Sequence, residues 1–376
     1  MWLSSACALK TSREQAVRES RQDDGDDNDD NDNDDNDNDD NDNDDNDNDD
    51  NDNDDMMASM GDGQTRALVL GGGGPVGRGW EIGLVTGLRS LGVELAEADL
   101  VVGTSAGAIV GAQLKLGRDL YMLLGPAPAA TASSSTVATV APAPSPPDLI
   151  AQLTEARRRA VTSADPEAEY RSIGQLSVST PTISEHEYVS GPRFASFAQC
   201  DAWPPGVLIT STDVETGQAQ VWTAASGVSL QKAIASSTAL PGAFPPVTVG
   251  AGKERYMDGG VRSMLHAPLA AGHRRILVVS CFPIFSHADD DDDDPIAAKL
   301  IDELDELKSS SDGTHIEVIE PNDEFQASFA HRLLDFSLVH DAYQLGLRQA
   351  KHEAERAARL WNTGNTATVT AAQALQ

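Results

Sequence analysis

The stretch 66-RALVLGGGGPVGRGWEIG-83 joins a short apolar run to four consecutive glycines and then to a segment with helical apolar spacing. An apolar run bounded by glycines predicts a buried strand over 66–70, and the spacing from about Gly79 to Leu91 predicts a helix. A glycine-rich turn between a strand and a helix gathers backbone N–H groups at the positive end of the helix. We therefore expect this turn to hold negative charge, either on a cofactor or on a reacting substrate.

One interpretation of the glycine run is a dinucleotide-binding turn. Residues 72–77 fit the pattern G-x-G-x-x-G, which follows the predicted strand and opens the predicted helix. Glu94 or Glu97 stands about 20 residues further on, where such a site carries the acid that contacts a ribose. The spacing alone is therefore compatible with a nucleotide-binding module.

The next strand–helix unit carries a candidate nucleophile. In 99-DLVVGTSAGAIVGAQLKLG-117, the pattern G-x-S-x-G places Ser105 between an apolar strand and an apolar helix. Gly103 and Gly107 leave room for the sharp turn that exposes such a serine, and the helix N-terminus directs partial positive charge toward it. Ser105 is therefore the predicted nucleophile of an acyl-transfer site.

Two further segments would complete an acyl-transfer site. The backbone N–H groups of Gly72, Gly73 and Gly74 would form an oxyanion hole for the tetrahedral intermediate. In 256-YMDGGVRS-263, Asp258 precedes two glycines, which is common in turns, but beside a nucleophilic serine it can act as the general base. A dinucleotide site needs no such serine, so the motifs taken together favour acyl transfer.

In this order, the motifs resemble those of the patatin-like phospholipases. The matching segments are the glycine-rich loop at 71–77, G-x-S-x-G at 103–107, D-G-G at 258–260, 235-ASSTALPGAFPPV-247 and the turn 212-TDVETG-217. The resemblance covers about residues 66 to 282. It implies an α/β fold with three α/β/α layers around a mainly parallel sheet, and a nucleophile elbow at Ser105. It also implies a Ser105–Asp258 dyad, in place of a triad, that hydrolyses acyl esters of phospholipids, lysophospholipids or other lipids.

The resemblance further implies the partners of the site, and this chain departs from the family in two places. The implied partner is a lipid at a membrane or micelle surface, with no nucleic acid, no cofactor and no metal. The family usually has Arg or Lys just before the last glycine of the loop, whereas this chain has Val76 there and Arg78 after Gly77. Near 264-MLH-266, the family often has Asn.

Two histidines raise a Ser-His-Asp triad as a rival mechanism. His266 and His273 follow Asp258, as the order in α/β-hydrolases requires. In those enzymes, however, a later strand carries the nucleophile, whereas here the serine follows a single strand–helix unit. We therefore expect both histidines to lie at the surface or behind the residues that contact substrate. A nucleotide-binding module and a catalytically weak lipid-binding relative of the same fold remain the alternatives.

Two runs of aspartate account for most of the charge. The formal net charge is −33, and 27 Asp lie within 23–55 and 289–294. Such runs repel themselves and bury no apolar surface, which predicts disorder. The expected domains are a disordered Asp- and Asn-rich extension (1–62), a patatin-like domain (63–363) with flexible insertions at about 125–148 and 286–295, and a C-terminal tail (364–376).

The remaining patterns concern secondary structure and location. They predict a hairpin over 206–224, a strand over 275–282, and helical segments over 149–161, 227–237, 296–310 and about 324–360. Cys7, Cys200 and Cys281 are too few and too far apart for a disulfide framework. No stretch has 18 uninterrupted apolar residues, so we expect no transmembrane helix. We therefore expect a cytoplasmic protein that meets membranes peripherally.

Overall fold

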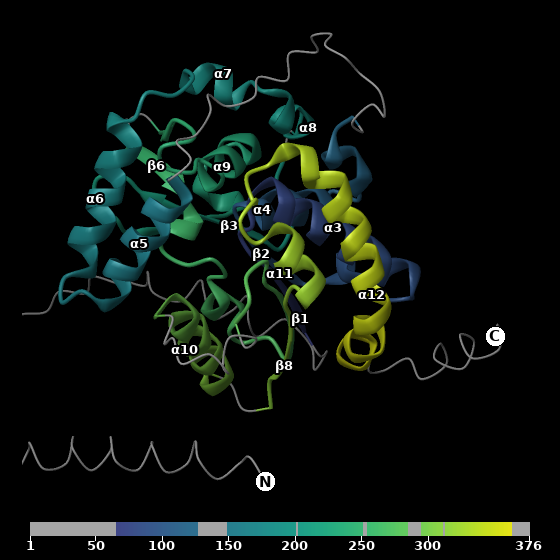
Figure 1. Ribbon diagram of the computed structural model, residues 1–376. Helices are drawn as coiled ribbons and strands as arrows, with labels where there is room; N and C mark the ends of the chain where they lie inside the picture. The colour runs from purple at the N-terminus through teal and green to yellow at the C-terminus, as the bar shows by residue number, and fades with distance from the viewer. Residues whose placement is uncertain are drawn as a thin grey trace, which may run out of the picture. The chain divides into compact units, whose positions relative to one another are not determined.

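A mixed β-sheet with helices on both faces forms the centre of the fold (Figure 1). The computed structural model describes residues 65–126, 149–200, 202–250, 254–284, 295–310 and 313–362. The predicted extension (1–62), the tail (364–376) and most of both predicted insertions lie outside these residues. Within the described ranges, no helix combines the length and apolar character that crossing a bilayer requires.

The strands are short and the helices vary widely in length. The strands are β1 (Arg66–Leu70), β2 (Leu100–Thr104), β3 (Val207–Asp213), β4 (Ala219–Trp222), β5 (Val247–Val249), β6 (Glu254–Asp258), β7 (Arg275–Val279) and β8 (His315–Ile319). The helices are α3 (Gly74–Ser90), α4 (Ala106–Lys115), α5 (Leu149–Thr162), α6 (Pro166–Ser179), α7 (Glu185–Val189), α8 (Ala195–Ala198), α9 (Leu230–Ser237), α10 (Pro295–Ser309), α11 (Asp323–Phe329) and α12 (Val339–Trp361).

The sheet is mainly parallel and is covered on both faces. Its order is β5-β6-β3-β2-β1-β7-β8, and β4 also pairs with β3. Strands β1, β2, β3, β7 and β8 form the parallel part, whereas β4, β5 and β6 pair in antiparallel fashion. Because side chains alternate along a strand, Leu68 and Leu70 pack into the core that includes α3, α4 and α12, while Ala67 and Val69 pack into the core that includes α10. This arrangement confirms the predicted three layers.

Most predicted elements form within a few residues of their predicted bounds, but the helix predicted over about 324–360 is interrupted. Helix α11 ends at Phe329 and α12 begins at Val339. Between them, the Asp335 carboxylate accepts the Ser337 N–H at 2.9 Å, a capping bond that starts a new turn instead of continuing the helix. The Leu333 carbonyl accepts the Val76 N–H at 3.1 Å, which holds the interruption against the start of α3.

Helix α3 begins at Gly74, five residues before the predicted start at Gly79. Glycine is a poor helix former, so the sequence pattern hides this first turn, although a proline in the first turn favours it. Glycines inside α3 instead serve contact with α12. A Cβ on Gly79 would lie 2.3 Å from the Val339 carbonyl oxygen, and one on Gly83 would lie 2.1 Å from that of Tyr343. The two helices therefore touch backbone to backbone.

Replacing Gly83 with Ala should destabilise the fold. The added methyl group cannot fit against the backbone of α12, and overpacking of this kind costs about 2 to 3 kcal/mol. The measurement is the free energy of unfolding in denaturant, with Arg89→Ala at the exposed end of the same helix as the control. Helix propensity alone would make Gly83→Ala stabilising by about 1 kcal/mol, so a stabilised variant would show that the close contact is absent.

Strand β3 brings the ends of two other strands together. One edge of β3 pairs with β4 along 209–212. On its other edge, β2 extends to Thr104 opposite Thr210, and β6 takes the next position with Asp258 opposite Ser211. Strand β2 runs parallel to β3 and β6 runs antiparallel to it. The carboxyl ends of β2 and β6 therefore meet head to head.

Candidate active site

Ser105 occupies a sharp turn between β2 and α4. Its backbone has φ 52 and ψ −111, a conformation that side chains rarely adopt. A Cβ on Gly103 would lie 2.6 Å from the backbone of α4, and one on Gly107 would lie 2.1 Å from the Leu70 carbonyl oxygen. The Ser105 N–H donates to Ser237 Oγ at 2.9 Å, which fixes the turn against α9. The two glycines thus allow the tight strand–turn–helix connection on which the prediction was based.

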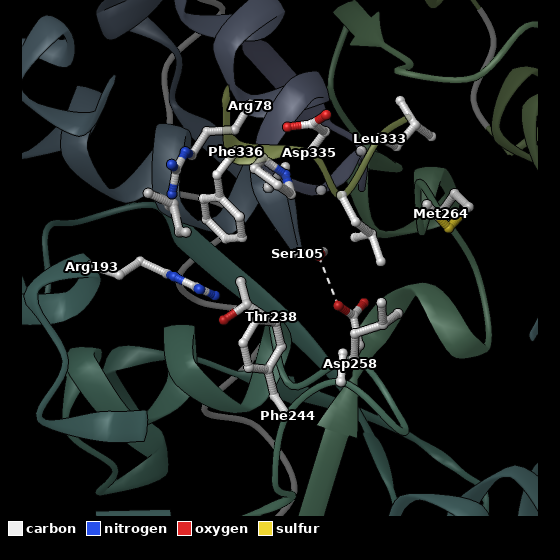
Figure 2. Close-up of a pocket in the computed structure, with 18 of the residues that line it drawn as sticks. Arg78, Ser105, Arg193, Thr238, Phe244, Asp258, Met264, Leu333, Asp335 and Phe336 are labelled. Carbon is white, nitrogen blue, oxygen red and sulfur yellow. Dashed lines mark hydrogen bonds between the residues drawn. The ribbon is translucent and has the colours of Figure 1, made fainter. Parts of the chain in front are cut away.

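Asp258 lies beside Ser105 because the ends of β2 and β6 meet. Ser105 Oγ donates a hydrogen bond to Asp258 Oδ2 at 2.8 Å (Figure 2), and the Gly260 N–H donates to Asp258 Oδ1 at 2.8 Å. The two side chains are almost fully buried, with 8% of Ser105 and 3% of Asp258 exposed. Burial raises the pKa of Asp258 to about 6, although both hydrogen bonds and the charge of Arg157 oppose the rise.

The glycine loop lies next to Ser105, but its N–H groups differ in availability. The Gly72 N–H donates to the Met264 carbonyl at 2.9 Å and is therefore occupied. Gly73 and Gly74 line the cavity that contains Ser105, and within the described ranges their N–H groups have no acceptor. The N–H group of Ala106, the first residue of α4, is likewise without an acceptor there. In the described part of these two turns, the unoccupied backbone donors near Ser105 are thus the N–H groups of Gly73, Gly74 and Ala106.

A cavity of about 430 Å³ opens over Ser105 and Asp258. Much of its wall is apolar, with Ile109, Leu240, Phe244, Phe282, Leu334 and Phe336 among the contributing residues. Pockets with mostly apolar walls and a few polar groups are typical of small-molecule sites. The cavity therefore suits a substrate with an apolar chain and a polar reacting group.

Several residues of the cavity were missed by the sequence analysis. Thr154 and Arg157 come from α5, Arg193 follows α7, and 333–337 is the interruption between α11 and α12. Helix α5 was predicted, but its apolar spacing does not tell which polar residues face a cavity. The residues around Arg193 carry no recognisable motif, and the interruption was predicted as helix. No sequence signal would have identified them.

Arg78 is placed in the cavity wall, whereas Val76 lies in the apolar core. The departure from the family loop therefore places the cationic residue two positions further along α3, where it still lines the cavity that contains Ser105 (Figure 2). Arg78 is 7% exposed, and burial together with the charge of Arg193 lowers its pKa to about 9. It still carries a positive charge at neutral pH.

The two histidines do not form a triad with Ser105. His266 is buried, not at the surface, and its Nδ1 lies 3.2 Å from Oγ1 of Thr104, the residue before Ser105. Burial and the charges of Lys299 and Arg262 lower the pKa of His266 to about 3, so it stays neutral. The His273 ring contacts backbone carbonyls near its own position. His266 thus supports the Ser105 turn from behind, which is one of the two positions expected for it from the sequence.

The structure places neither Glu94 nor Glu97 beside the glycine loop, where the dinucleotide interpretation requires an acid. The Glu97 carboxylate pairs at 3.0 Å with Arg66, the first residue of β1, whereas the glycines follow the last residue of β1. Glu94 pairs with Arg89 at 3.3 Å. Glu97 therefore lies at the amino end of β1, whereas the glycines follow its carboxyl end. Neither acid can contact a ribose bound at the glycines. Within the described ranges, no cluster of three or more His, Cys, Asp or Glu side chains could hold a metal ion.

Comparison with known proteins gives one family. The family model described as patatin-like phospholipase matches residues 68–271, more than half of the chain. Among solved structures, VipD from Legionella pneumophila is similar at 14% identity, covering 78% of this chain and 67% of its own, with a TM-score of 0.36. The type III effector protein ExoU is similar at 16% identity, covering 77% and 54%, with a TM-score of 0.26. No curated protein sequence matches the chain.

Proposed function

The chain belongs to the patatin-like phospholipase family, and from this premise we propose that it is a serine acyl hydrolase with a Ser105–Asp258 dyad. Its substrates are carboxylic esters of phospholipids, lysophospholipids or other acyl lipids, met at a membrane or micelle surface. The observation that carries the proposal is the 2.8 Å hydrogen bond from Ser105 Oγ to Asp258 Oδ2 inside a cavity with apolar walls. An oriented nucleophile, an adjacent base and room for an acyl chain are what ester cleavage requires.

Acylation starts with transfer of the Ser105 hydroxyl proton to Asp258 while Oγ attacks the ester carbonyl carbon. The carbonyl oxygen becomes an oxyanion, for which the free N–H groups of Gly73, Gly74 and Ala106 are the nearby donors. Losing one such donor typically raises the barrier by about 3 kcal/mol. As the tetrahedral intermediate collapses, the alcohol leaves with the proton from Asp258, and the acyl group remains on Ser105.

Deacylation repeats these steps with water as the nucleophile. Asp258 takes a proton from the water, whose oxygen attacks the acyl carbon. The Ser105 oxygen then leaves with that proton, and a free fatty acid is released. The raised pKa of Asp258 suits both directions of transfer, because a base near neutrality can accept the proton and return it.

The activity should fall in acid as Asp258 becomes protonated. Only the ionised carboxylate can accept the serine proton, and its pKa is about 6. Below that pH, kcat/KM should decrease about tenfold per pH unit, and above it kcat/KM should level off. The measurement is kcat/KM for p-nitrophenyl butyrate across this range, with activity re-measured at neutral pH after acid exposure to separate titration from unfolding. A profile that stays level well below pH 6 would contradict the role of Asp258.

The proposed function is tested by labelling and by product analysis. A fluorophosphonate probe should attach to Ser105, as identified by mass spectrometry of the labelled peptide. Phospholipid micelles should release free fatty acid at a rate that prior labelling abolishes. A folded protein that neither reacts with the probe nor releases fatty acid would be a non-catalytic lipid-binding relative, and the proposal would be wrong.

A further inference from the structure

Three arginines line the cavity, Arg78, Arg157 and Arg193. Arg157 acts on Asp258 through its charge, and the other two have no acidic partner in the described part of the chain. Many described arginines pair with carboxylates, as Arg332 does with Asp335 at 2.6 Å. Arg78 and Arg193 form no ion pair within the described part of the chain, and Arg78 Nε has no hydrogen-bond partner. Burying a charge without a counter-charge is costly. An unpaired, nine-tenths buried guanidinium in a cavity wall therefore points to a negative group that arrives with a ligand.

The arginine pair is held in place from two separate elements. Arg78 extends from α3. Burial lowers its pKa, and the positive charge of Arg193 is close enough to lower it further. Arg193 lies within 4.6 Å of the Phe244 ring centre and 5.4 Å of the Phe336 ring centre. Such cation–π contacts orient a guanidinium without neutralising it. Two like charges are thus brought together in front of the same cavity.

The position of the two arginines relative to Ser105 indicates that the negative group belongs to the same ligand whose ester is held at Ser105. Figure 2 shows Arg78 and Arg193 on one side of Ser105 and Asp258 on the other. The acid of the cavity rim, Asp335, is already paired with Arg332 and does not neutralise them. A ligand whose ester carbonyl lies at Ser105 can therefore place an anionic group on the arginine side while its acyl chain contacts the apolar wall.

We propose that Arg78 and Arg193 bind the phosphate of an acyl lipid whose ester is held at Ser105, so that the protein prefers lipid esters with a negatively charged phosphate head group over neutral ones. Guanidinium groups match the geometry of phosphate oxygens. Two guanidiniums from different elements match a tetrahedral group with several oxygens better than they match a planar carboxylate. This inference rests on the proposed function and names the substrate class of the same site.

The preference can be tested without turnover. In the Ser105→Ala variant of the full chain, lysophosphatidic acid and the monoacylglycerol with the same chain are titrated by calorimetry below their micelle concentrations. Lysophosphatidic acid should bind at least about tenfold more tightly, and Arg193→Gln should remove most of that ratio, since a charged hydrogen bond of this kind is worth about 10- to 100-fold in binding. Arg193→Lys should retain part of it. Arg348→Gln, a surface arginine paired with Glu324, should change neither affinity.

Competition experiments identify the kind of anion that the arginines bind, and thermal unfolding shows whether each variant is folded. Inorganic phosphate should compete with lysophosphatidic acid, and acetate should compete far less. Thermal unfolding of each variant shows whether the fold is kept; where Arg78→Gln does not fold, Arg193→Gln at the cavity rim carries the test. In the enzyme with Ser105, the ratio of kcat/KM for the two lipids should fall with the same substitutions.

The inference is overturned if the two lipids bind equally, if Arg193→Gln weakens both by the same factor, or if phosphate binds and the lipid does not. Acetate competing as well as phosphate would also overturn it, because the site would then be a carboxylate site. The proposed function fails separately, by absence of fluorophosphonate labelling and fatty acid release. Binding in the Ser105→Ala variant can succeed in that case, so the two failures are distinguishable.

Discussion

Replacing Ser105 with Ala is expected to lower kcat/KM for p-nitrophenyl butyrate by about 10⁴-fold or more. In serine hydrolases the loss of the nucleophile removes the covalent pathway, and only the oxyanion donors and substrate binding continue to act. Among the described residues, Ser105 supplies the one hydroxyl group that is hydrogen-bonded to the Asp258 carboxylate, so no second hydroxyl there is placed to take over the attack. The measurement is the steady-state rate with a titrated enzyme, so that trace contamination is visible.

Two variants make this result interpretable. Ser90→Ala, at the exposed end of α3, should keep full activity. Ser105→Gly should be as inactive as Ser105→Ala but more stable, because glycine tolerates φ 52 whereas alanine keeps the strain, which is worth about 1 to 3 kcal/mol. If Ser105→Ala retained more than a few per cent of the activity, Ser105 would not be the nucleophile and the proposed function would be wrong.

Replacing Asp258 with Asn is expected to lower kcat about 10³- to 10⁴-fold while raising stability at pH 8. The Gly260 N–H and the Ser105 hydroxyl bond to different carboxylate oxygens, Oδ1 and Oδ2. In Asn, the amide oxygen can still accept the Gly260 N–H, and the amide NH2 can donate to Ser105 Oγ, so the geometry is kept. The amide cannot accept the serine proton, and loss of a general base costs up to about 10⁴-fold. Kinetics of p-nitrophenyl butyrate hydrolysis and thermal unfolding measure the two effects on the same protein.

The stability effect has a defined pH dependence. The pKa of Asp258 is raised from 3.8 to about 6 in the folded state, so the unfolded chain loses this proton first as pH rises. The wild type therefore loses stability between about pH 4 and pH 6, by about 3 kcal/mol in total, and stays lower above pH 6. Asp258→Asn should have a higher Tm than wild type at pH 8 and a nearly equal one near pH 4. A Tm that falls equally at both pH values would show that Asn breaks the packing.

The local features of the site could be read from the sequence, because each depends on neighbours in the chain. An apolar run before a glycine turn predicted β1, and the same logic placed Ser105 between β2 and α4. Gly103 and Gly107 flank a turn that only glycines fit. These interactions act within about ten residues, where spacing carries the information.

The long-range features could not be read in that way. That Ser105 meets Asp258 depends on β2 and β6 sharing one edge of β3, and the family resemblance, not the spacing, suggested it. The occupied Gly72 N–H and the position of Arg193 depend on loops that pack from distant parts of the chain. The start of α3 was missed because close contacts of Gly74 with Leu333 and of Gly77 with Cys281, not helix propensity, select the glycines of its first turn.

The head-to-head meeting of β2 and β6 has a consequence for biosynthesis. Ser105 and Asp258 are 153 residues apart, and they come together only when β6 pairs with β3. A ribosome-bound chain that has emerged as far as β4 contains the Ser105 turn but not yet Asp258. On the proposed mechanism, the chain therefore gains activity only after β6 has been synthesised and has paired with β3.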